Sequence, residues 1–220
     1  MMVAFHGCYD LTYFGYAHFR MLEHPFWIGW RTLIVGSFVF LAGVSLTLSR
    51  TGSQRSATTR LLQLAGCAAL VSGTTAVLFG ARWIYFGVLH FFTVATLLTR
   101  PLLRHTVFLG AAGLVLFVLG WTVGLDAMNP RGLNWLGFAS LKPQTEDYAP
   151  LAPWLGLLWL GAWAAARFPG LAGPARSATP PRTPTLTQRF SQATQYLGRH
   201  SLTVYMVHQP LLFGILFLTR

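Results

Sequence analysis

Seven hydrophobic segments, each about as long as a bilayer is thick, constrain this chain more than any other feature of its sequence. A membrane-spanning helix needs roughly 17 to 25 mostly apolar residues. The segments of this kind are residues 1–19, 27–48, 61–80, 83–99, 106–125, 151–168 and 197–218. A soluble protein with seven buried helices would need polar outer faces, and residues 61–80 and 106–125 have none. The sequence therefore predicts an all-α, polytopic membrane helix bundle with about seven transmembrane helices.

The charged residues predict the orientation of the bundle. The net charge is +11, but the arginines fall in short connections and form no amphipathic surface that would bind nucleic acid. Three connections are basic, after the second, fourth and sixth segments: Arg50, Arg55 and Arg60; Arg100 and Arg104; Arg167, Arg176, Arg182 and Arg189. Basic connections of membrane proteins are cytoplasmic. We therefore expect a cytoplasmic N-terminus and Arg220 on the outer side.

One stretch of the chain lacks the hydrophobic residues that a packed core needs. Residues 169–189 are rich in proline, small residues and arginine. Such a composition is typical of linkers that do not fold by themselves. We predict a single domain over residues 1–220, with a flexible cytoplasmic linker at 169–189.

The first segment carries two ionisable residues at membrane depth, His6 and Asp10. They are four residues apart, so a helix presents both on one face. Ionisable groups inside a membrane are unfavourable and usually mark a functional site. The pair therefore predicts a polar cavity inside the bundle.

Two later segments carry polar residues that we also expect to line this cavity. His90 lies in the middle of the fourth segment, and a histidine bonded to a neighbouring helix is the alternative interpretation there. His208 and Gln209 precede Pro210, which removes a helical hydrogen bond and predicts a kink. A kink without any chemistry is the alternative for this segment.

Outward connections hold two further candidates. His24 lies just before the second helical segment, where a histidine can exchange protons near neutral pH. An interfacial histidine beside aromatic anchors is the alternative. Asp147 and Tyr148 precede the sixth segment, and a carboxylate there can bind an amine or a sugar from outside. A solvated loop is the alternative for these two residues.

Five blocks of the sequence, in order, resemble one family. They are MMVAFHGCYDLTYFG, HPFWIGWRTLIVGSFVFLAGVSLTLS, IYFGVLHFFTVATLL, DYAPLAPWLG and LGRHSLTVYMVHQP. Together they cover nearly the whole chain. The chain resembles the bacterial membrane proteins related to the catalytic domain of heparan-alpha-glucosaminide N-acetyltransferase, which implies a location in a bacterial inner membrane. It lacks the leading Asp and Arg-Gly motif of that family, so we expect a first helix without its usual beginning.

The resemblance implies an enzyme that moves an acetyl group from cytoplasmic acetyl-CoA to the amine of a sugar or glycoconjugate on the far side of the membrane. It implies that His24 is catalytic, as a general base or a transient acyl carrier. The interior path would be lined by His6, Asp10, His90, His208 and Gln209. Asp147 and Tyr148 would bind the acceptor, and Arg100 and Arg104 are candidates for the anionic part of CoA because guanidinium groups pair with phosphate. No metal is expected.

Two other classes of function stay open on the sequence alone. The same histidines and aspartate can form the path of a proton-coupled transporter for a small solute. A membrane scaffold without activity is the other alternative. Besides the lipid bilayer and the acceptor, a second copy of the chain is a conceivable partner.

Overall fold

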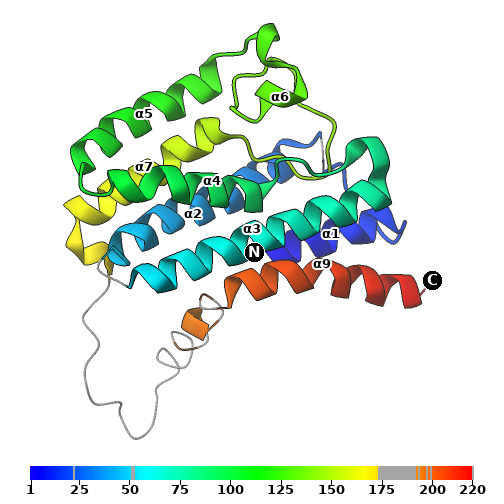
Figure 1. Ribbon diagram of the computed structural model, residues 1–220. Helices are drawn as coiled ribbons and strands as arrows, with labels where there is room; N and C mark the ends of the chain where they lie inside the picture. The colour runs from blue at the N-terminus through cyan, green and yellow to red at the C-terminus, as the bar shows by residue number, and fades with distance from the viewer. Residues whose placement is uncertain are drawn as a thin grey trace, which may run out of the picture. The chain divides into compact units, whose positions relative to one another are not determined.

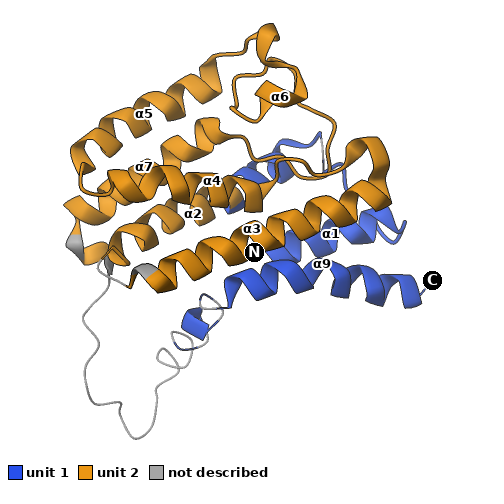
Figure 2. Cartoon of the chain, in the orientation of Figure 1, with its two compact units in different colours: residues 1–34, 174–220 blue, residues 35–173 orange. Residues whose placement is uncertain are grey.

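The computed structural model describes residues 1–21, 23–50, 53–172, 192, 194–196, 198 and 200–219. The chain divides into two compact units, shown in Figure 2. Unit 1 comprises residues 1–34 and 174–220, and unit 2 comprises residues 35–173. The predicted linker lies outside the described residues from position 173 onward. The prediction of a single domain stays a prediction.

The fold is a set of helices whose order follows the hydropathy of the sequence (Figure 1). The seven predicted segments correspond to α1 (Met2–Tyr13), α2 (Pro25–Leu48), α3 (Gln54–Phe79), α4 (Val88–Thr99), α5 (Thr106–Thr122), α7 (Leu151–Arg167) and α9 (Ser201–Leu218). Shorter elements lie between them: η1 (Gly80–Arg82), η2 (Arg100–Leu102), η3 (Asp126–Met128), α6 (Arg131–Asn134) and η4 (Pro169–Ala172). The predicted all-α fold with about seven hydrophobic helices is confirmed.

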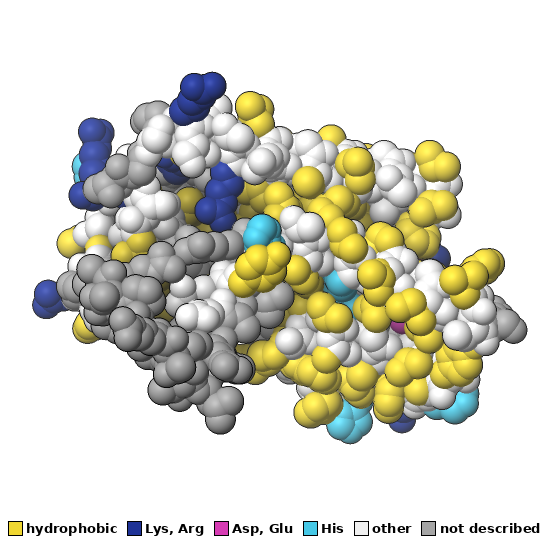
Figure 3. All heavy atoms as spheres, turned by 90° about the horizontal axis from the view of Figure 1, so that it is seen from below, with side chains coloured by type: hydrophobic (Ala, Val, Ile, Leu, Met, Phe, Trp, Pro, Cys, Tyr) yellow, Lys and Arg dark blue, Asp and Glu magenta, His cyan; other side chains and the backbone are white. Residues whose placement is uncertain are grey.

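Length and exposure both indicate a membrane protein. Three helices in the described part of the chain, at 25–48, 55–82 and 201–218, are long and apolar enough to cross a bilayer, and α4 and α5 are shorter apolar helices. Large apolar side chains point outward, with Leu62 at 66%, Val77 at 86% and Val107 at 79% exposure. Hydrophobic side chains also cover much of the face drawn in Figure 3. Lipid tails, rather than water, are the solvent that suits such a surface.

The first helix ends earlier than the hydrophobic segment 1–19 predicts. It stops at Tyr13 because Gly15 adopts a φ of +82°, a conformation that other residues rarely adopt. The amide of Tyr16 then donates to the carbonyl of Leu11 at 2.9 Å. This bond and the left-handed glycine form the usual C-terminal helix cap. A local glycine signal therefore overrides the hydropathy of the next residues.

Within unit 1, α1 and α9 run in the same direction. Three side-chain pairs join the two helices in ascending register: His6 with His208, Asp10 with Gln209, and Tyr16 with Thr219 just beyond the helix ends. Two parallel helices at the beginning and end of a membrane chain require an odd number of crossings. The predicted number, seven, meets this requirement.

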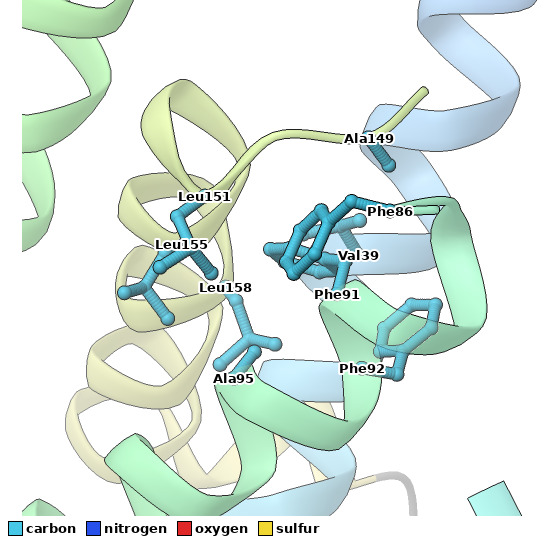
Figure 4. Packing of buried hydrophobic residues seen from close by; sticks show 9 residues of the cluster. All are labelled: Val39, Phe86, Phe91, Phe92, Ala95, Ala149, Leu151, Leu155 and Leu158. Atoms are coloured by element: carbon cyan, nitrogen blue, oxygen red, sulfur yellow. The ribbon is translucent and has the colours of Figure 1, made fainter. Parts of the chain in front are cut away.

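Unit 2 is built around α7. Its buried core contains side chains from α2, α4 and α7 and from the loops before α4 and α7 (Figure 4): Val39, Phe86, Phe91, Phe92, Ala95, Ala149, Leu151, Leu155 and Leu158. Glycines bring the helix backbones close together. A Cβ atom on Gly43 of α2 would lie 1.9 Å from the carbonyl oxygen of Leu158, and one on Gly156 of α7 would lie 2.6 Å from that of Gly113 in α5. Small residues at helix contacts are typical of membrane bundles.

The connections of unit 2 gather at two ends. At one end, Arg82 after α3 pairs with Glu146 before α7 at 3.4 Å. At the other end, Arg50 after α2 donates to the carbonyl of Leu103 after α4 at 3.4 Å. The connections that follow α2 and α4 thus lie at one end of unit 2, and those that follow α3 and precede α7 lie at the other. The predicted topology requires this alternation. Which end faces the cytoplasm stays a prediction.

Candidate functional site

Four of the five residues predicted to line a cavity meet in unit 1. His6 and Asp10 of α1 face His208 and Gln209 of α9, and we call these four residues the α1–α9 polar cluster. The Gln209 amide donates to Oδ1 of Asp10 at 2.9 Å, and His6 Nδ1 lies 3.2 Å from His208 Nε2. The helical spacing of four residues places the first two side chains on one face, as predicted.

The hydrogen bonds of the two histidines define their protonation pattern. His208 Nδ1 lies 2.7 Å from the carbonyl oxygen of Tyr205 and 3.1 Å from that of Val204, so it must donate. In a neutral ring Nε2 of His208 is then an acceptor, and His6 Nδ1 donates to it. Nδ1 of His6 also lies 3.2 Å from the carbonyl oxygen of Met2. This leaves Nε2 as the acceptor nitrogen of His6.

The cluster contains two buried polar atoms without a hydrogen-bond partner. Asp10 is completely buried, at 0% exposure. Its Oδ2 atom and the Oε1 atom of Gln209 are buried and make no hydrogen bond among the described residues. Both atoms are hydrogen-bond acceptors when the carboxylate is ionised. Buried polar atoms are rarely left unpaired, so this pair requires an explanation.

His90, the fifth of these residues, lies in unit 2 and is fully bonded there. Its Nδ1 accepts the amide hydrogen of Gly87 at 3.3 Å, so in the neutral ring Nε2 carries the proton and donates to Oγ of Ser72 on α3 at 3.0 Å. Ser72 in turn donates to the carbonyl of Ile84 at 2.6 Å. This is the bonded histidine that the sequence left open as an alternative. Ser72 was not singled out, since one serine in a hydrophobic helix is no signal by itself.

Asp147 lies at the N-terminus of α4. Its Oδ2 accepts the amide hydrogen of Val88 at 2.8 Å. A Cβ atom on Gly87 would lie 2.3 Å from that oxygen, so the close approach requires a glycine. A carboxylate that binds free amides at a helix N-terminus is favoured by the helix dipole. One carboxylate oxygen of Asp147 is therefore engaged in holding α4.

Tyr148 belongs to a buried network around Asn134. The Tyr148 hydroxyl donates to the Asn134 carbonyl at 2.7 Å, and the Tyr85 hydroxyl donates to Asn134 Oδ1 at 2.9 Å. Burial raises the pKa of Tyr148 to about 12, and the nearby Tyr85 adds to the effect. Asn134 is 1% exposed. Sequence reasoning missed it because it lies in a long connection without any periodic pattern.

His24 lies directly before α2 and is exposed. Its Nδ1 accepts the amide hydrogen of Phe26 at 3.2 Å, which caps the first turn of the helix. Pro25 follows as the first helical residue, a position that suits proline. In the neutral ring the proton is then on Nε2, so proton uptake by His24 requires this cap bond to open.

Arg100 and Arg104 lie at the end of α4 and just after η2. Arg104 is exposed, and its Nε donates to His105 Nε2 at 2.9 Å. Arg20 pairs with Glu23 and Arg82 pairs with Glu146, and no described carboxylate forms an ion pair with Arg100 or Arg104. These guanidinium groups are available to an anion. Among the described residues, no group of three His, Cys, Asp or Glu side chains has the arrangement of a metal site.

Comparison with known proteins identifies the family. Residues 1–210 match the family described as heparan-alpha-glucosaminide N-acetyltransferase, catalytic, so the match extends from α1 to Pro210 in α9. No curated protein and no solved structure matches the chain. The resemblance seen in the sequence is confirmed, and the apolar helices indicate an integral membrane protein. The chain therefore belongs to the family of the heparan-alpha-glucosaminide N-acetyltransferase catalytic domain, whose activity is that of a transmembrane acetyltransferase.

Proposed function

We propose that this protein transfers an acetyl group from cytoplasmic acetyl-CoA to the amine of an amino sugar on the extracytoplasmic side of the membrane. The observation that carries the proposal is the family match over residues 1–210. The apolar helices and the parallel course of α1 and α9 support it, because the reaction needs a chain that reaches both sides of the bilayer.

The chemistry requires a proton acceptor. A protonated amine loses one proton to the base, and its nitrogen attacks the thioester carbonyl. As the carbon–sulfur bond breaks, the nitrogen loses a second proton, which the departing thiolate takes to leave as the CoA thiol. A positioned histidine typically accelerates such proton transfers by about 10²–10⁴-fold. We assign this role to His24, which is exposed at the start of α2.

The cap bond of His24 makes this role conditional on a local movement. Nδ1 is engaged by the Phe26 amide, and a neutral ring carries its only proton on Nε2. His24 becomes a base when the Phe26 amide releases Nδ1. Proton transfer is thus coupled to opening of the first turn of α2. The transient acyl carrier is the second form of the same proposal, with the acetyl group on a ring nitrogen.

The remaining roles follow from charge and position. Arg100 and Arg104 bind the phosphates of CoA, because no described carboxylate pairs with them. Asp147 and Tyr148 shape the connection that faces the acceptor, and their bonds to Val88 and Asn134 hold it in place. The α1–α9 polar cluster lines the interior path.

Acetylation assays on the purified full chain in lipid test the function. Labelled acetyl-CoA and glucosamine should give labelled N-acetylglucosamine. His24→Asn is the informative variant, since asparagine still caps a helix but cannot accept a proton. We expect its turnover to fall by about 100-fold or more. His18→Asn, the same change in an exposed histidine of the same connection, is the control and should keep full activity.

Two outcomes contradict the proposal. Absence of any acetylated sugar under conditions in which the protein is folded removes the function. Full activity of His24→Asn removes the role of His24 and leaves the function. The alternative of a proton-coupled transporter predicts no acetylated product and uptake of glucosamine into acidified vesicles instead. An inactive scaffold predicts neither.

A further inference from the structure

Among the buried side-chain nitrogen and oxygen atoms of the described residues, only Asp10 Oδ2 and Gln209 Oε1 have no hydrogen-bond partner. Asp10 is 0% exposed, and its other oxygen is bonded to the Gln209 amide at 2.9 Å. The two unpaired atoms therefore belong to side chains that already hold one another. A buried carboxylate stays ionised when a counter-charge is present and its acceptor positions are filled; without them it takes up a proton.

The ionisable side chain that interacts electrostatically with Asp10 is that of His208. Neither the Arg20–Glu23 pair nor the Arg82–Glu146 pair includes Asp10. The hydrogen bonds of His208 to the carbonyls of Tyr205 and Val204, and of His6 to His208, suit two neutral rings. In this neutral form neither histidine supplies the missing charge. The missing group carries a positive charge and donates to at least two acceptors.

A protonated primary amine has these properties. Its ammonium group carries one positive charge and three N–H donors, enough for Asp10 Oδ2, Gln209 Oε1 and one further acceptor. His6 Nε2, one helical turn from Asp10 on the same face, is an acceptor left open by the tautomer pattern. A sugar hydroxyl offers one donor and no charge, so it would leave the carboxylate without compensation.

We infer that Asp10 and Gln209 bind the ammonium group of a primary amine. That this amine is the acceptor sugar of the acetyl transfer rests on the proposed function. Asp10 is better suited than Asp147 to this task, because Oδ2 of Asp147 is already bonded to the Val88 amide.

Pro210 gives the amine a way in. It follows Gln209 inside α9, and a proline cannot donate the hydrogen bond to the carbonyl four residues earlier, that of Met206. Helices bend most easily where such a bond is missing. α9 is continuous from Ser201 to Leu218, and the inferred site requires it to bend at this point when the amine enters.

Binding measured without acetyl-CoA tests the inference apart from the reaction. The full chain in lipid nanodiscs is titrated calorimetrically with glucosamine and with two neutral analogues, N-acetylglucosamine and glucose. We expect glucosamine to bind at least tenfold more tightly than either analogue. Equal binding of all three sugars, or no binding, overturns the inference. This comparison uses the unaltered protein, so it does not depend on the folding of a variant.

Variants locate the site. Asp10→Asn keeps the size of the side chain and removes its charge, and should weaken glucosamine binding at least tenfold. Gln209→Leu removes the second acceptor and should weaken it severalfold. Asp126→Asn is the matched control, since Asp126 is an exposed acid of unit 2, and should bind as the unaltered protein does. Undiminished binding by Asp10→Asn contradicts the inference.

Ethanolamine distinguishes the two sources of a primary amine. Amino sugars and the headgroup of phosphatidylethanolamine share the ammonium group. Binding of glucosamine alone, lost in Asp10→Asn, supports the inference and its link to the acceptor. Binding of ethanolamine alone, lost in the same variant, supports an amine site and contradicts that link. A protein that binds glucosamine through Asp10 but acetylates nothing keeps this inference and loses the proposed function.

Discussion

Unit 1 and unit 2 differ in whether the hydrogen bonds of their buried polar groups are complete. Among the described residues of unit 2, every buried side-chain nitrogen and oxygen has a hydrogen-bond partner. His90 bonds Ser72 and Gly87, and Asp147 bonds the first turn of α4. In unit 1, Asp10 and Gln209 bond one another and still leave two acceptors unpaired.

The difference separates polar residues that hold the fold from polar residues that await a ligand. The sequence alone does not distinguish a histidine or aspartate that holds the fold from one that binds a ligand. The bonds of such a residue decide which task it has, because a fully bonded group has no acceptor or donor left for a substrate. Substitutions of the fully bonded polar residues of unit 2 should therefore lower stability, and substitutions in the α1–α9 polar cluster should lower binding.

The largest effect on stability is expected at the contact of α2 with α7. Gly43→Ala places a methyl group 1.9 Å from the carbonyl oxygen of Leu158, and the backbone must move apart. We expect the free energy of unfolding to fall by about 3 kcal/mol, measured by titration with SDS in mixed micelles. Gly66→Ala in α3 is the control and should not destabilise, because a Cβ atom there would meet nothing within 4 Å beyond the neighbouring backbone of its own helix. A stable Gly43→Ala variant would mean that the two helices do not pack as described.

His90→Leu is expected to have the next largest effect. It leaves the Gly87 amide without its acceptor and removes the donor to Ser72. The expected loss is about 2 kcal/mol of unfolding free energy. Acetylation per folded molecule should be unchanged, which distinguishes a bonded structural histidine from one that serves the reaction. A selective loss of activity would move His90 into the functional set.

Substitution of Asp147 is expected to lower the unfolding free energy by a smaller amount, and comparison of two variants provides the control. Asp147→Ala removes the acceptor of the Val88 amide and should cost about 1 kcal/mol of stability. Asp147→Asn retains an oxygen for that bond and should lose less. If Asp147 also binds the acceptor sugar, both variants raise the KM for glucosamine. Equal KM values in the two variants and the unaltered chain restrict Asp147 to its helix-capping bond.

The smallest effect is a dependence of stability on high pH. The pKa of Tyr148 is raised to about 12 in the folded protein, so the folded state holds this proton more tightly than the unfolded state. The stabilisation is complete below pH 10 and is lost as the pH rises from about 10 to about 12. At pH 11 the loss should be at most about 1 kcal/mol, since Tyr148 is only partly buried. Tyr148→Phe should reduce this pH dependence; an unchanged profile would contradict the burial of the hydroxyl.

Local properties of the sequence predicted the helices well. Hydropathy over about 20 residues located all seven, because membrane insertion depends on the composition of one segment at a time. The ends were harder to predict. Gly15 stops α1 at Tyr13, and α4 starts at Val88 rather than at residue 83, because Asp147 from a distant loop bonds its first amide. Asp147 lies 59 residues from Val88 in the sequence, so no local pattern predicts this start.

The sequence by itself determined the helical membrane fold, the family and the residue types at membrane depth. It placed His6 beside Asp10 because four residues make one helical turn. Only the tertiary structure decided that Gln209, 199 residues later, bonds Asp10, whereas His90 bonds Ser72. Helix formation depends on near neighbours, but the bonds of a buried side chain depend on which helices pack together. For that reason the unpaired atoms of Asp10 and Gln209 became visible in the folded protein alone.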